Sequence, residues 1–186
     1  MNREETVRIL EGISGAYPNF LKSVSEKELS HMADMWASVF TDDPFELVAA
    51  GTKAFITADT KGFAPVPGQI KAKMQLIQNP NEITEMEAWG LVHKAIRSGE
   101  STGHGISCRK AWEELPEDIK NIVSSGELSQ WAVTDSSQMS VISSNFMRSY
   151  TARMTQKKEY EKLPLDVRAV IENNTKALEG EENESI

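Results

Sequence analysis

Apolar residues recur at helical spacing along almost the whole chain. The clearest stretch follows Ser25, which forms a capping pair with Glu28, three residues further on. Its apolar positions are spaced three and four residues apart, as on one face of a helix. These positions are Leu29, Met32, Ala33, Trp36, Val39 and Phe40. The same pattern returns throughout the sequence and predicts an all-α fold.

The first part of the chain is predicted to form a small bundle of four helices. Asp42 or Asp43 is expected to cap the third of them, with Pro44 in its first turn. A loop rich in proline and glycine follows over residues 57–69, because both residue types interrupt helices. A short fourth helix is predicted to follow the loop, with Ile70 among its apolar residues.

The best candidate for a domain boundary is Asn79-Pro80-Asn81, where the aromatic composition also changes. Five of the six phenylalanines precede it and three of the four tryptophans follow it. We therefore expect an N-terminal helical domain over residues 1–79 and a second helical domain over 84–174. Residues 175–186 are expected to be an acidic disordered tail, because the segment holds too few apolar side chains to offset the entropy of ordering.

The second domain is predicted to begin at a capping pair formed by Thr84 and Glu87. The glycine-rich segment 98–107 is expected to be a flexible connection between helices. Short helices follow, and then a longer helix from Asp135 with an apolar side. A last helix is predicted to begin near Pro164 and to bury three apolar residues, which are Val167, Val170 and Ile171.

One segment of the second domain has an echo further along the chain. Residues 112–123 read Trp-Glu-Glu-Leu-Pro-Glu-Asp-Ile-Lys-Asn-Ile-Val, and residues 160–171 read Tyr-Glu-Lys-Leu-Pro-Leu-Asp-Val-Arg-Ala-Val-Ile. In both, Leu-Pro places a proline in the first turn of a helix, and an aspartate lies near its positive end. Reused helix-start chemistry is the favoured interpretation, and a duplicated unit is the alternative.

Composition and charge exclude several classes of function. The 186 residues carry 20 basic and 28 acidic side chains, a net charge of -8, which argues against non-specific nucleic-acid binding by the whole molecule. No apolar run approaches the roughly 18 residues of a membrane helix. The acidic start lacks the apolar stretch of a signal peptide, so we expect a cytoplasmic protein without a membrane partner.

No motif for catalysis, metal binding or cofactor binding emerges from the sequence. The single cysteine, Cys108, and three scattered histidines cannot build an ordinary zinc site. The glycines of segment 98–107 lack the Gly-Lys-Ser/Thr ending of a phosphate-binding loop. His104 lies near Cys108 in sequence, but proximity in sequence does not make a catalytic dyad. We therefore expect no enzyme and no cofactor.

A basic cluster in the long helix is the one candidate for nucleic-acid contact. Its cations could bind phosphates, and the tyrosines among them could stack on bases. A solvated helix face is the favoured alternative. The candidate residues are Arg148, Tyr150, Arg153, Lys157, Lys158 and Lys162.

Residues 1–77 resemble a known family. Tyr17-Pro18 ends the first helix, Trp36 precedes Phe40 by four residues, and Asp43-Pro44-Phe45 opens the third helix. Ala54-Phe55-Ile56, Phe63-Ala64-Pro65-Val66-Pro67 and Gln69-Ile70-Lys71 complete the pattern. In these features the chain is similar to the phage-encoded replicative helicase loader/inhibitor family, whose members are small helical proteins.

The resemblance implies a non-enzymatic adaptor that binds a hexameric replicative DNA helicase in the cytoplasm of the bacterial host and loads or inhibits it. An origin-binding protein would compete for the adaptor. In the family a C-terminal segment contacts the helicase, so the resemblance points here to the acidic end of the chain, with Glu179, Glu181, Glu182, Glu184 and Ile186 as candidates. Two alternatives remain open: a DNA-binding replisome organiser that uses residues 148–162, and a helical phage assembly chaperone.

Overall fold

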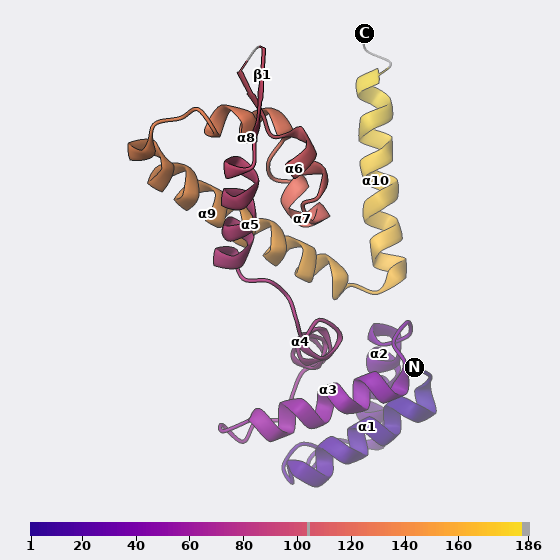
Figure 1. The fold of residues 1–186 in the computed structure, drawn as a ribbon. Helices are drawn as coiled ribbons and strands as arrows, with labels where there is room; N and C mark the ends of the chain where they lie inside the picture. Colours follow the sequence, from indigo (N-terminus) through magenta and orange to yellow (C-terminus); the bar gives the residue numbers. More distant parts are fainter. Residues whose placement is uncertain (104, 184–186) are drawn as a thin grey trace. The chain divides into compact units, whose positions relative to one another are not determined.

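A computed structural model describes the chain over residues 1–103 and 105–183, and its side chains as far as Lys176 with the same gap. Within this part the chain forms ten helices and one two-stranded sheet (Figure 1). The predicted all-α class is therefore confirmed. None of the described helices combines the length and the hydropathy that crossing a bilayer requires.

The chain divides into two compact units. Met1–Pro80 and the chain from Lys158 onward form unit 1, and Asn81–Lys157 forms unit 2. The domain ranges expected from the sequence remain a prediction.

Unit 1 opens with four helices joined by short connections. They are α1 (Arg3–Ala16), α2 (Glu26–Val39), α3 (Phe45–Ala58) and α4 (Pro67–Gln78). At the start of α2 the Ser25 hydroxyl accepts from the backbone of Glu28, whose carboxylate accepts from the Ser25 backbone N–H at 2.8 Å. This reciprocal capping box satisfies donors that the helix leaves unpaired, as the sequence predicts.

The predicted cap of α3 is wrong. Pro44 occupies the capping position, and no side chain accepts a hydrogen bond there. The two aspartates bond elsewhere: Asp43 accepts from the Lys71 ammonium at 2.5 Å, and Asp42 accepts from the backbone N–H of Leu165 at 2.8 Å. Both carboxylates thus connect segments that are distant in sequence. The rules that identify a helix cap use only neighbouring residues, so they do not predict such long-range contacts.

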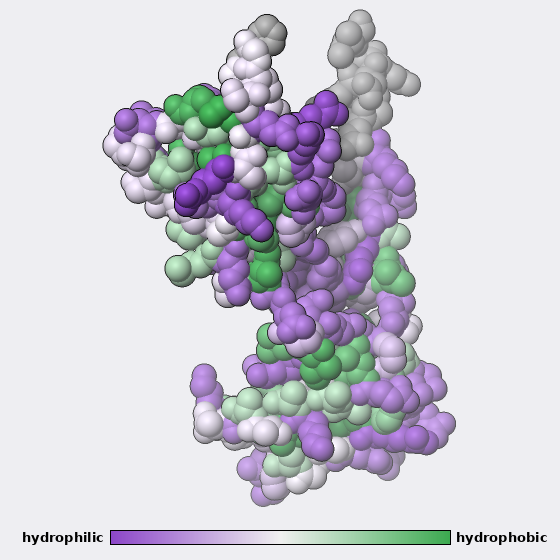
Figure 2. All heavy atoms as spheres, in the orientation of Figure 1, coloured by the Kyte–Doolittle hydropathy of each residue, from purple (hydrophilic) through white to green (hydrophobic). Residues whose placement is uncertain are grey.

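The core of unit 1 lies between these four helices. Gly51 of α3 permits close packing of α4, because a Cβ there would lie 2.7 Å from Cγ of Met74 and 3.2 Å from the carbonyl oxygen of Ile70. Outside the core, Leu76 and Ile77 of α4 stay exposed, and Figure 2 shows hydrophobic residues on this part of the surface. The largest fully buried side chains of unit 1 are Phe40, Leu10, Ile13, Ile70 and Met74.

Unit 2 contains shorter elements around one long helix. They are α5 (Glu85–Arg97), β1 (Glu100–Thr102), β2 (Gly105–Ser107), α6 (Arg109–Glu113), α7 (Glu117–Lys120), α8 (Ser125–Trp131) and α9 (Ser136–Glu161). The backbone N–H and the hydroxyl of Thr84 donate to Glu87 at the start of α5, and these bonds hold the pKa of Glu87 below its ordinary value of 4.5. The predicted capping pair is therefore confirmed.

The glycine-rich segment forms a β-hairpin instead of the expected flexible connection. Its strands are antiparallel, with Glu100 opposite Ser107 and Thr102 opposite Gly105. Gly99 at its base is required by packing, since a Cβ there would collide with Cγ2 of Ile106 and lie 2.9 Å from Sγ of Cys108. Strands of three residues lack the alternating apolar pattern that identifies a strand in sequence.

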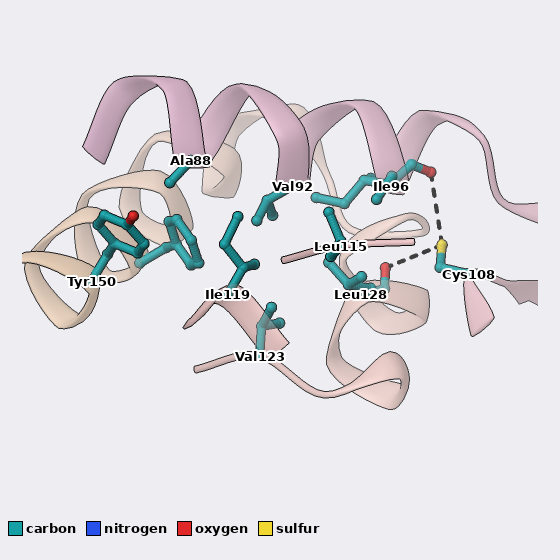
Figure 3. Packing of buried hydrophobic residues seen from close by; sticks show 11 residues of the cluster. Ala88, Val92, Ile96, Cys108, Leu115, Ile119, Val123, Leu128 and Tyr150 are labelled. Atoms are coloured by element: carbon teal, nitrogen blue, oxygen red, sulfur yellow. Dashed lines mark hydrogen bonds between the residues drawn. The ribbon is translucent and has the colours of Figure 1, made fainter. Parts of the chain in front are cut away.

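The core of unit 2 is a cluster of side chains from α5, the short helices and α9 (Figure 3). Val92 and Ile96 of α5 face Ile119 and Leu128 of the short helices. The Sγ atom of Cys108 lies 3.6 Å from the Leu128 carbonyl oxygen, and burial raises the pKa of its thiol. Cys108 thus packs as a small apolar residue in this core.

Candidate protein-binding surface

The last helix, α10 (Leu165–Asn183), is connected to α9 by a sharp turn that side chains hold in place. The Arg168 guanidinium donates to the carbonyl oxygens of Leu163, at 2.8 Å, and of Glu161. Its central carbon lies 5.6 Å from the ring centre of Tyr160, within the range of a cation–π contact. These contacts fix the direction in which α10 leaves the turn.

Two further bonds anchor the first turns of α10. The Tyr160 hydroxyl donates to Glu172 at 2.7 Å, and this bond raises the pKa of Tyr160 above its ordinary value. Within unit 1, the backbone N–H of Leu165 donates to Asp42. The helix N-terminus would otherwise leave this N–H unpaired, so Asp42 acts here as a cap contributed by a distant segment.

The apolar residues of α10 are exposed, although the sequence predicts that they are buried. The exposed fractions are 40% for Val167, 59% for Val170 and 40% for Ile171. Their spacing of three and four residues places them on one side of the helix. Figure 2 shows hydrophobic residues among hydrophilic ones on this part of α10. We call these three residues the α10 stripe.

Comparison with the echo segment shows how unusual this exposure is. In both copies a cation eight residues after the aromatic ring lies 5.6 Å from its centre, Arg168 over Tyr160 and Lys120 over Trp112. The two helix corners are therefore built alike. In unit 2, Ile119 and Val123 are the equivalents of Val167 and Ile171 and are almost completely buried, while Ile122, the equivalent of Val170, is half-buried against the same core. The equivalent side chains of α10 have no such core.

The acidic candidates for partner contact fall largely within α10. Glu179, Glu181 and Glu182 belong to its helical backbone, whereas Glu184 and Ile186 lie outside the described residues. The segment from 175 to 183 is thus helical where we expected an independent disordered tail. Its alanine, leucine, lysine and glutamates are good helix formers, which allows α10 to continue this far.

The basic cluster of α9 does not form one continuous cationic surface. Lys157 pairs with Asp118 at 2.8 Å, and Lys162 pairs with Glu159 at 2.6 Å. Arg148 and Arg153 are exposed, and Lys158 is half-buried. Carboxylates thus neutralise at least two of the five cations.

Tyr150 is a correction to the nucleic-acid prediction. Its side chain is only 3% exposed, and its ring packs on Phe146 in the core of unit 2. The hydroxyl donates to the carbonyl oxygen of Ile83. A ring held in the core cannot stack on a base. Tyr150 follows Phe146 by four residues on the apolar side of the predicted helix, and this spacing already indicated a buried position.

Unit 1 has a surface pocket where the turn after α1 meets the loop between α3 and α4. It measures about 590 Å³, and Phe63 on its edge is 74% exposed. Asp59 accepts from the backbone N–H groups of Lys61 and Gly62 and from the Tyr17 hydroxyl. These bonds, the one from Lys61 first, hold the pKa of Asp59 below its ordinary value and fix the loop.

The described residues do not bring reactive groups together. No group of three or more histidine, cysteine, aspartate or glutamate side chains among them is arranged to hold a metal ion. The features that stand out on both units are exposed apolar side chains on a helical scaffold. Exposed apolar side chains that share one helix face are candidates for contact with another macromolecule.

Comparison with the families of known proteins gives a match for the N-terminal part of the chain. Residues 1–71 match the model of the gp39P N-terminal domain, which describes a phage helicase loader/inhibitor. This match spans α1 to α3 and the beginning of α4, and it confirms the resemblance to the phage helicase loader/inhibitor family for this part of the chain. No curated protein and no solved structure matches the chain.

Proposed function

We propose that this protein is a non-enzymatic adaptor of phage DNA replication that binds the hexameric replicative helicase and loads or inhibits it. The observation that carries the proposal is the match of residues 1–71 to the N-terminal domain of the gp39P family. The adaptor acts by occupying a helicase surface and releasing it when an origin-bound partner competes. Such a switch requires only differential affinity for two states of the helicase and no chemistry by the adaptor.

We assign the helicase contact to α10. Its stripe presents Val167, Val170 and Ile171 as anchors, and the acidic residues that follow would contact basic groups around the apolar contact. An amphipathic helix laid into an apolar groove uses anchors at this spacing. Two observations support this assignment. The stripe is exposed, and the bond from Arg168 to Leu163 fixes the direction of α10 after the turn.

The experiment is a binding measurement between purified hexameric helicase and three forms of the chain. They are the full chain, a chain that ends at Asn174, and the variant Ile171→Glu. We expect the full chain to bind and the shortened chain to bind more weakly. Ile171→Glu should lose at least about tenfold in affinity, because it puts a charge where the complex would bury an apolar side chain. Val133→Glu is the matched control, since Val133 is 65% exposed and lies in unit 2.

The measurement tests helicase binding and the assignment of the contact to α10 separately. If the full chain fails to bind helicase, the proposed function is refuted. If all forms bind equally well, the helicase contact lies outside α10 and our assignment of the surface is wrong. Strong, salt-sensitive binding of DNA by the chain alone would instead favour the replisome organiser, because phosphate contacts weaken steeply with salt.

A further inference from the structure

We propose that the groove between α5 and α9 of unit 2 binds the α10 stripe of a second copy of this chain. The groove measures about 330 Å³. Trp89, Gly90 and His93 line it on α5, and Met139, Ser140 and Ser143 line it on α9. The inference does not rest on the proposed helicase contact, because it concerns the protein alone.

The groove is shaped for close approach of another element. Gly90 is exposed, and a Cβ built on it would meet no atom within 4 Å. Glycine inside a helix lowers stability relative to alanine, and no described neighbour in unit 2 requires it at this position. With Ser140 and Ser143 opposite, the groove has a floor of small residues over which a helix can lie.

The wall of the groove is apolar and firmly held. The Trp89 ring centre lies 5.7 Å from that of Phe146, which belongs to the core, and 6.2 Å from that of His93. Met86, one turn earlier on α5, is 74% exposed. The partly buried tryptophan therefore offers an apolar surface that does not need to rearrange before a partner binds.

The charges around the groove select an acidic partner. No carboxylate is among the described residues that line it. Lys94 and Arg97, on the turn of α5 beyond His93, are exposed and make no ion pair with any described side chain. Glu85 and Glu87 lie at the opposite end of α5. The groove thus combines an apolar wall with an unpaired positive end.

α10 has the complementary properties. Its three stripe residues are exposed, and the helix carries five acidic and two basic residues over Leu165–Asn183. An apolar stripe on an acidic helix matches an apolar groove with a positive end, since charge complementarity directs association and sets its register.

Each chain carries both halves of the contact, the groove on unit 2 and the stripe on α10. Two copies can therefore exchange α10 reciprocally, which gives a two-fold dimer.

The test uses the full chain in two differently labelled populations. One population carries Gly90→Cys, and the other carries Val170→Cys and heavy nitrogen. Native Cys108 is fully buried, so it does not compete in mild oxidation. We expect a disulfide between a light and a heavy chain, identified by mass spectrometry. Gly12→Cys replaces Gly90→Cys in the control pair, because Gly12 is also an exposed helical glycine with open space around it.

Light scattering of the chain without cysteine substitutions gives an independent measure. We expect its average mass to rise with concentration above that of one chain. Gly90→Lys fills the groove and should raise the dissociation constant at least about tenfold, whereas Gly12→Lys should leave it unchanged. Ile171→Glu should weaken association to a similar extent, and high salt should weaken it for the unmodified chain as well.

Several results would overturn the inference. A mass of one chain at every concentration means that the protein does not self-associate. Equal cross-linking of the Gly90 and Gly12 pairs means that contact is unspecific. Self-association that Ile171→Glu abolishes and Gly90→Lys leaves intact places α10 on another surface. These results do not decide whether the chain binds helicase, because that binding is measured separately with purified helicase. The two proposed contacts share the α10 stripe, so a helicase and a second copy would compete for it.

Discussion

The ion pair between Lys71 and Asp43 provides the sharpest test of how unit 1 is held together. The two side chains are only 9% and 17% exposed, and Nζ of Lys71 lies 2.5 Å from the carboxylate. The ammonium also lies 5.4 Å from the ring centre of Phe40. The pair joins α4 to the corner between α2 and α3, so its removal should weaken the whole unit.

The cost depends on which partner is removed. Asp43→Ala leaves a nearly buried ammonium unpaired, and we expect a loss of about 3–5 kcal/mol in the free energy of unfolding. The contact with Phe40 offsets about 0.5–2 kcal/mol of that loss. Lys71→Met leaves the more accessible carboxylate, and we expect a smaller loss of about 1–3 kcal/mol. The double variant leaves no unpaired charge, so it should cost clearly less than the two single losses together.

The assay must report on unit 1 alone, because a chain of two units need not unfold in one step. Trp36 is the single tryptophan of residues 1–80, and its side chain is 6% exposed. Urea titration followed by fluorine NMR of 5-fluorotryptophan therefore separates its signal from those of the other tryptophans. Single losses that simply add in the double variant would refute the reasoning, since coupling is expected only between interacting side chains.

Two further predictions concern unit 2. The pKa of Glu87 is lowered in the folded state, so its capping contribution is present above pH 4.5 and is lost as the pH falls through the folded pKa. Glu87→Gln should therefore flatten the acid side of a plot of unfolding free energy against pH. Gly99→Ala should lose about 1–3 kcal/mol in urea unfolding, because the new Cβ meets Ile106. Gly90→Ala should gain up to about 1 kcal/mol in the same measurement, since its Cβ enters open space; a loss there would contradict our account of the groove.

The helical fold could be predicted because helix signals are local. The capping boxes at Ser25 and Thr84 and the apolar spacing of the helices after them lie within a few residues of sequence. The paired strands β1 and β2 were missed because they are short and largely exposed. The role of Asp42 as a cap for α10 was missed because its partner lies 123 residues away.

The candidate surface could be predicted only in part. The sequence identified the C-terminal region through a family resemblance and placed the contact on its glutamates. It assigned the α10 stripe to a buried face, because apolar spacing shows which residues share a side of a helix and not what covers that side. The segment after Trp112 has the same apolar spacing, but its side chains pack against the core of unit 2. Only the structure therefore distinguishes this segment from the α10 stripe.

The bond between Gln75 and the backbone of Lys158 has a consequence for how the chain is assembled. Nε2 of Gln75 lies 2.9 Å from the carbonyl oxygen of Lys158, so the chain leaves unit 1 after α4 and re-enters it at a neighbouring point. In sequence, unit 2 is thus an insertion between two segments of unit 1 that meet at this bond. A protein in which a short linker replaces residues 81–157 should keep α1 to α4 and the beginning of α10 together, whereas a fragment that stops at Pro80 lacks a segment of unit 1.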